Sequence, residues 1–240
     1  GLEAGTNHGR AADKYVYSAS VVNQWLEKPS TQPKNKKIVF VTFDDGPTTK
    51  FTGEQLDNLE KAGARATFFM IPPQMRDVGK NLLSRSLKMG NALAIHSYSH
   101  DYKYLYHGRA ADKAKHIGCD WDWAMAQSRA ILGSNYFSSA FRYPGGHMSW
   151  TNLSQADAAL AKRGVGWIDW NAMSGDADAQ RPTTVPGYLQ MVKKSIKESN
   201  NPNVVVILNH DTYGKQMTAK AMPSILAWLK SQGYEFGVIA

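Results

Sequence analysis

The chain has 240 residues, of which 42% are hydrophobic and 20% are charged, and its formal net charge is +8 at pH 7. This length suits one domain around one buried core, and the composition excludes disordered and fibrous proteins. The positive charge favours polyanionic surroundings, but the basic residues are scattered and accompany no helix-turn-helix pattern. We therefore expect no nucleic-acid partner.

The single cysteine, Cys119, excludes an intramolecular disulfide, and we expect it to be a small buried residue on a helix. No run of about 18 apolar residues is present, so no segment of this chain is expected to span a membrane. The sequence begins at Gly1 rather than Met, which leaves room for a signal peptide or membrane anchor removed from its N-terminus. We expect a monomer.

Residues 1–36 are polar, are interrupted by two prolines and contain one predicted amphipathic helix at 18–26, so we expect an N-terminal arm or cap. Over residues 37–240, short apolar runs alternate with stretches in which apolar residues recur at helical spacing. Strands are predicted at 38–43, 66–70, 92–95, 140–143, 165–170, 204–208 and 235–239. Helices are predicted at 54–61, 79–89, 110–131, 152–162, 186–198 and 219–231.

This alternation predicts an α/β fold in which parallel strands are joined by right-handed crossovers. Such strands form either an open sheet or a barrel. Seven units favour a distorted (β/α) barrel with about seven parallel strands, in which one strand is missing or irregular. Residues 176–186 are rich in Asp, Gln, Pro and Thr and are expected to form a loop.

Ionisable residues follow five of the predicted strands. In parallel α/β folds, ligands bind beyond the carboxyl ends of the strands, so these side chains are expected at one rim. They are Asp44, Asp45, His96, His100, Arg142, Asp169, Asp176, His210 and Asp211.

The segment from His96 to His100 places two imidazoles four residues apart, and both can meet one ion if the segment makes a helical turn. By itself this spacing is equally consistent with two surface histidines. Asp44 and Asp45 are the natural source of a third ligand, although adjacent aspartates also occur in exposed turns. One carboxylate can bind the ion while the other takes a proton from the water that the ion acidifies.

Two further rim residues have chemistry that this arrangement can use. His210 can donate a proton to a leaving group, or it can be a histidine whose ring is satisfied by loop carbonyls. Arg142 can pair with a carboxylate and fix its orientation and pKa.

Four segments resemble the ordered motifs of the NodB-like polysaccharide deacetylases, carbohydrate esterase family four. They are Thr42-Phe43-Asp44-Asp45-Gly46-Pro47, His96-Ser97-Tyr98-Ser99-His100, Arg142-Tyr143-Pro144 and Ile207-Leu208-Asn209-His210. The resemblance runs from about residue 37 to residue 240, which would make this region the catalytic domain. It implies a distorted (β/α) barrel and a hydrolase that removes N-acetyl or, in some members, O-acetyl groups from polysaccharides.

By motif position, the resemblance implies that Asp44 is the general base and His210 the general acid. It implies that Asp45, His96 and His100 hold one divalent metal ion. Zinc is the expected ion, with cobalt or another divalent ion as alternatives.

The resemblance also implies that Leu208 shapes the apolar pocket for the acetyl methyl and that Arg142 orients the base through a carboxylate. The motif that supplies this carboxylate usually ends in Asp-Trp, whereas here Asp176 is followed by Ala177. We assign Asp176 as the partner of Arg142, with Asp169 as the alternative.

A second departure follows Pro144, where the family usually has an aromatic residue and this chain has Gly145 and Gly146. The Gly145 amide can still donate a hydrogen bond to an oxyanion, but the side-chain wall would be missing. Other aromatic side chains can supply sugar-stacking faces, although a tryptophan at a strand end is more often part of the core. These are Trp150, Trp167, Trp170 and Tyr213. A tyrosine cluster is expected in a loop that packs over the barrel, with a groove wall as the alternative. It comprises Tyr98, Tyr102, Tyr104 and Tyr106.

We expect a metal-dependent, extracellular or cell-surface enzyme that acts on peptidoglycan, because a basic domain is attracted to an anionic wall and the arm could follow a membrane anchor. Chitin oligomers and acetylated xylan are alternative substrates. A carbohydrate-binding module on a catalytically silent scaffold is the alternative of a different class.

Overall fold

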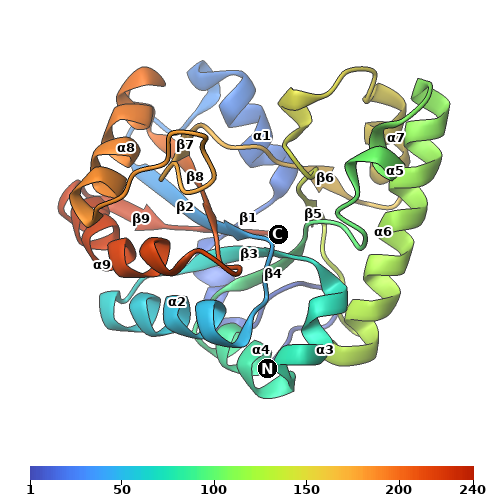
Figure 1. The fold of residues 1–240 in the computed structure, drawn as a ribbon, viewed down its shortest axis with the longest axis horizontal. Helices are drawn as coiled ribbons and strands as arrows, with labels where there is room; N and C mark the ends of the chain where they lie inside the picture. Colours follow the sequence, from blue (N-terminus) through green and yellow to red (C-terminus); the bar gives the residue numbers. More distant parts are fainter.

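The computed structural model describes residues 1–240, and its centre is a curled sheet of parallel strands (Figure 1). The strand order along the sheet is β6-β5-β4-β3-β2-β8-β7, and β9 pairs with β2. The prediction of a distorted (β/α) barrel with about seven parallel strands is confirmed. The bounds are β2 Lys37–Asp44, β3 Ala66–Met70, β4 Ala92–Ile95, β5 Ala140–Phe141, β6 Gly166–Trp167, β7 Ala172–Met173, β8 Val204–His210 and β9 Tyr234–Phe236.

Helices surround this half-barrel on its outer face (Figure 1). Six of them match the predicted helices within a few residues and pack an apolar stripe against the sheet. They are α2 Thr49–Ala62, α4 Lys80–Lys88, α6 Ala110–Leu132, α7 Ser154–Lys162, α8 Val185–Glu198 and α9 Gln216–Ser231, and the short helices α3 Met75–Val78 and α5 Tyr102–Tyr106 were not predicted. Residues of the tyrosine cluster therefore lie in a helix rather than wholly in a loop.

Alternating side chains of β2 enter two different cores, because successive residues of a strand point to opposite faces. Val39 and Val41 belong to the cluster of 40 buried residues between the strands and the outer helices. Ile38 and Phe40 belong to a cluster of 11 buried residues that fills the barrel interior. Both faces of β2 are covered, which is why this strand is apolar nearly throughout.

Two of the predicted strands, at 165–170 and 235–239, differ from the structure. The strand predicted at 165–170 ends at Trp167, because the chain then leaves the sheet and turns its Ile168 and Asp169 carbonyls toward Arg142. The strand predicted at 235–239 divides at Gly237, where a side chain would meet the Phe40 ring at 2.6 Å. β9 pairs with β2 before this point, and β10 (Val238–Ile239) pairs with β1 (Val16–Tyr17) after it.

The N-terminal 36 residues pack against the barrel. β1 adds to β10, and α1 (Ala19–Glu27) begins at Ser18, whose hydroxyl accepts a hydrogen bond from the Val21 amide. Ala19 and Val22 of this helix are buried in the interior cluster. The helix contacts both β6 and β8, so it covers the side on which the half-barrel does not close.

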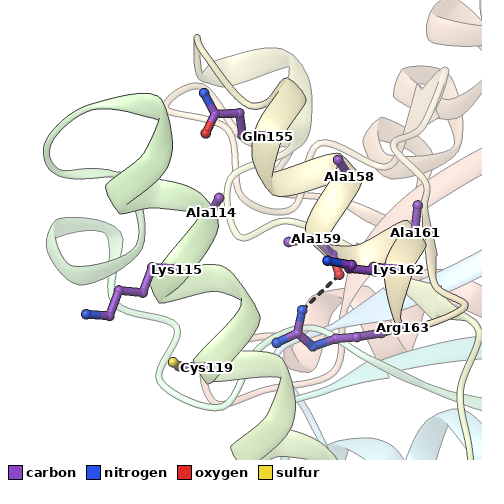
Figure 2. Close-up of a pocket in the computed structure, with 9 residues that line it drawn as sticks. All are labelled: Ala114, Lys115, Cys119, Gln155, Ala158, Ala159, Ala161, Lys162 and Arg163. Carbon is purple, nitrogen blue, oxygen red and sulfur yellow. Dashed lines mark hydrogen bonds between the residues drawn. The ribbon is translucent and has the colours of Figure 1, made fainter.

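A groove of about 910 Å³ lies between α6 and α7, and Figure 2 shows the residues that line it. Cys119 lies half-buried on α6 in this groove, which contains none of the ionisable rim residues. No helix is both long enough and apolar enough to cross a membrane.

Candidate metal and catalytic site

The ends of neighbouring strands bring the ionisable residues together. Asp44 is the last residue of β2, and His210 is the last residue of β8 and its partner in register. His96 directly follows β4, and the loop after it carries His100. The structure therefore brings Asp44, His96, His100 and His210 to the same edge of the sheet.

Three of these residues converge on one point. The Nε2 atoms of His96 and His100 each lie 3.2 Å from Asp45 Oδ1. His96 Nδ1 lies 2.9 Å from the Arg142 carbonyl oxygen, and because a carbonyl only accepts, Nδ1 carries the proton and Nε2 presents a lone pair. Asp45 Oδ1 is buried without a hydrogen-bond partner. A divalent cation fits this set of acceptors.

The ionised state of Asp45 also supports a cation site. Burial by itself raises the pKa of Asp45, but the adjacent His100 and His96 imidazoles outweigh it and hold the pKa well below its usual range. For His100, burial lowers the pKa, whereas Asp45 raises it, and the net shift is upward. Asp45 is thus a carboxylate anion near neutral pH, which is the form that binds a metal.

The loop between the two histidines is irregular, not the helical turn that the four-residue spacing suggested. Ser97 has φ 124° and His100 has φ 48°, which are costly values for residues with side chains. Asp120 of α6 holds this loop. Its carboxylate accepts hydrogen bonds from the Ser97 hydroxyl at 2.7 Å, the Tyr98 amide at 2.8 Å and the Ser99 amide at 3.0 Å.

Asp120 was missed in the sequence because it lies in the middle of a helix, away from any strand end. It is fully buried, on the same face of α6 as Ile117 and Trp121. An acidic residue inside the apolar stripe of a helix was the available signal, since such a group requires partners when buried.

Arg142 pairs directly with Asp44, so the assignment of Asp176 as its partner was wrong. Its Nη1 donates to Asp44 Oδ1 at 2.9 Å and to the Thr42 hydroxyl at 2.6 Å. The Nε and Nη2 atoms donate to the carbonyls of Ile168 and Asp169. The arginine is fully buried and reaches across the barrel interior from β5 to β2, where no carboxylate but Asp44 lies within reach.

The alternative partner, Asp169, also uses its carboxylate elsewhere. It accepts hydrogen bonds from the amides of His147 at 2.8 Å and Met148 at 2.9 Å. Only its backbone carbonyl contacts Arg142. Asp169 therefore fixes the loop after β5 and does not balance the arginine's charge.

Asp176 holds His210 instead. Its Oδ1 lies 2.7 Å from His210 Nδ1, and its Oδ2 accepts from the His210 amide and the Thr218 hydroxyl, each at 2.9 Å. Burial lowers the pKa of His210, but the hydrogen bond and charge of Asp176 raise it to about 9. The ring is protonated at neutral pH, with Nε2 lying 3.9 Å from Asp45 Oδ2.

The four residues predicted to contact substrate lie in different settings. Gly145 has φ 79°, and Leu208 lies half-buried in β8. The Trp170 ring lies over the Arg142 guanidinium, 5.4 Å from it, and occupies the space beside Gly146. Tyr213 is 79% exposed and meets Phe51 edge to face.

Together the fold and the rim define a parallel α/β protein with a candidate metal site, and comparisons with known proteins place the chain in a family. The sequence model of the polysaccharide deacetylase family matches residues 31–163, and the chain belongs to this family. Members are hydrolases that act on the amide bonds of N-acetylated polysaccharides. The resemblance noted in the motifs is thereby confirmed.

A solved CE4 esterase from Streptococcus mutans is 39% identical, with a TM-score of 0.90 over 100% of this chain and 98% of the esterase. A peptidoglycan-N-acetylglucosamine deacetylase from Bacillus cereus is 28% identical over 85% of this chain and 69% of its own length. A bifunctional xylanase/deacetylase from Pseudobutyrivibrio xylanivorans is 30% identical over 88% of this chain, which spans 31% of that protein.

Proposed function

We propose that this chain is a metal-dependent deacetylase that hydrolyses the acetamide of N-acetylglucosamine in peptidoglycan. One observation carries the proposal. Asp44, fixed by the buried Arg142, lies beside three converging metal-binding atoms, while a protonated His210 faces the same point from the next strand. A base, a metal site and an acid in this arrangement suit amide hydrolysis.

Asp45, His96 and His100 would hold the metal. Two imidazoles and one carboxylate suit zinc, and cobalt or another divalent ion would also be accepted. When bound, the ion would polarise the acetyl carbonyl and make water more acidic. The orphaned Asp45 Oδ1 and the lone pair of His96 Nε2 support this assignment.

Asp44 would take the proton of the attacking water. Arg142 binds Asp44 Oδ1, so Oδ2 remains free and lies 3.7 Å from His96 Nε2, on the side of the metal ligands. The arginine thus fixes one oxygen and leaves the other for proton transfer.

His210 would protonate the departing sugar nitrogen, because that nitrogen must leave as an amine. Asp176 keeps the ring oriented and charged through Nδ1, which directs Nε2 toward the reacting group. The Gly145 amide would donate to the developing oxyanion. Leu208 would line the pocket for the acetyl methyl, and Trp170 and Tyr213 would contact the sugar chain.

Peptidoglycan is the proposed substrate because the net charge of +8 attracts an anionic wall and because the Bacillus cereus relative is a peptidoglycan-N-acetylglucosamine deacetylase. We propose that the chain acts as a monomer, outside the cell or at its surface. Chitin oligomers and acetylated xylan are the competing substrates, and the xylanase/deacetylase relative favours testing the latter.

Acetate release from purified peptidoglycan, chitin oligomers and acetylated xylan tests this choice when measured in parallel. We expect the greatest kcat/KM on peptidoglycan and a free amine in its product. Release confined to xylan would overturn the substrate class. Binding to peptidoglycan without release from any polymer would instead favour a carbohydrate-binding module on a silent scaffold.

A further inference from the structure

The turn after Pro144 has no side chain of its own to bound the site, yet the space beside it is lined. A Cβ atom placed on Gly145 would lie 3.2 Å from the Tyr102 hydroxyl oxygen and 3.2 Å from Trp150 Nε1. These two aromatic residues come from other parts of the chain and stand where an aromatic side chain at position 145 would project. The expected gap in the wall is therefore covered.

A different pair, Tyr106 and Trp150, fixes the turn itself. The Tyr106 hydroxyl donates to the Pro144 carbonyl oxygen at 2.7 Å, and Trp150 Nε1 donates to the same oxygen at 3.0 Å. Their rings stack with centroids 3.9 Å apart and planes inclined by 15°. This pair is structural, because both polar atoms are used within the protein.

Tyr102 differs from this pair in its exposure and in its hydroxyl. It is 46% exposed, and its hydroxyl makes no hydrogen bond to another residue. Its ring lies 5.6 Å from the ring of the metal ligand His100 and 5.2 Å from Trp150. An aromatic face with a free hydroxyl next to a reactive centre is suited to binding a sugar ring.

The Tyr102 hydroxyl can donate a hydrogen bond to a sugar, because a tyrosine side chain carries one O–H donor. Asp101 accepts a hydrogen bond from the Tyr104 amide and caps helix α5, which fixes the backbone from which Tyr102 projects.

We propose that Tyr102 positions the sugar that carries the acetamide, with its ring as the wall beside Gly145 and its hydroxyl as a donor to the pyranose. The inference rests on the proposed deacetylase function. It names the ligand class as an N-acetylhexosamine unit. It also explains how the site can dispense with an aromatic residue after Pro144.

The test compares Tyr102→Phe, Tyr102→Leu and Tyr102→Ala with wild type on N-acetylglucosamine oligomers and on 4-nitrophenyl acetate, which has no sugar. We expect KM for the oligomers to rise about five- to twentyfold in Tyr102→Ala and less in Tyr102→Phe. The kcat, the zinc content and the rate on 4-nitrophenyl acetate should stay near wild type. Trp123→Ala, at a residue that is 50% exposed on α6, is the matched control and should change none of these values.

An unchanged KM in Tyr102→Ala would overturn the inference while leaving the deacetylase function in place. Equal losses on both substrates, together with loss of zinc in Tyr102→Leu and Tyr102→Ala, would show that the residue only supports His100, and would overturn it too. A wild-type protein that releases no acetate from any oligomer or polymer, even with zinc bound, would contradict the proposed function itself.

Discussion

Replacing Asp176 with Asn should move the alkaline limit of activity toward neutral pH. In the wild type, burial lowers the pKa of His210, but the Asp176 carboxylate 2.7 Å from Nδ1 raises it to about 9, against an ordinary value of 6.5. Asn has the same size and can still accept one hydrogen bond, but it carries no charge. The pKa of the imidazole should then fall to its ordinary value or below.

The size of the effect follows from the fraction of His210 that is protonated. At pH 8.5, a pKa of about 9 leaves about three quarters of the rings protonated, whereas a pKa of 6.5 leaves about 1%. Because the acid form is the one that protonates the leaving amine, kcat/KM should fall by a factor of about 75 at pH 8.5 and by less than about twofold at pH 6.

The same substitution should change stability with a defined sign. The raised pKa of His210 contributes stability that is fully present below the unfolded value of 6.5 and is lost as pH rises through about 9. The assay is a pH profile of kcat/KM from pH 5 to 10, with thermal unfolding at pH 6 as the companion measurement. An alkaline limb at the same pH in both proteins would refute the role of His210 as the acid that Asp176 tunes.

Three further substitutions test separate contacts. Arg142→Met leaves Asp44 buried without its partner, so we expect loss of turnover and a drop of about 3–5 kcal/mol in unfolding free energy, measured by denaturant titration. Burial raises the pKa of Asp211 to about 7, so the stability of the wild type should decrease as the pH rises from about 4 to about 7. Asn cannot ionise, so Asp211→Asn should raise the unfolding midpoint more at pH 8 than at pH 5. Gly146 has φ 90°, and Gly146→Ala would place a Cβ 2.7 Å from the Trp170 ring. Calorimetry should show a lower unfolding midpoint, and the tryptophan fluorescence should change. A pH-independent effect at Asp211, or wild-type values for either other variant, would contradict these contacts.

Much of the fold could be predicted from the pattern of apolar residues. β2, β3, β4 and β8 are apolar runs buried on both faces, and this composition is typical of parallel strands. β7 was missed because its two residues, Ala172 and Met173, carry no β-branched side chain and pair only with β8. Short strands at the two open ends of a half-barrel give little local signal.

The residues of the site could be located from strand ends, but their pairing could not. Arg142 meets Asp44 because its side chain crosses the barrel interior, a path that spacing along the chain does not encode. Asp176 meets His210 because the loop after β7 folds back over the end of β8. A sequence motif identifies which ionisable groups lie at the rim. Which of these groups form hydrogen-bonded pairs depends on the path of each side chain and loop in the folded protein.

Zinc content and acetate release, measured together on wild type and Asp44→Asn, test the central claim most directly. We predict about one zinc per chain in both proteins, acetate release by the wild type that chelation abolishes and zinc restores, and release by Asp44→Asn at least about a hundredfold slower. Release that persists after the metal is removed, or near-wild-type release by Asp44→Asn, would contradict a metal site with Asp44 as its base.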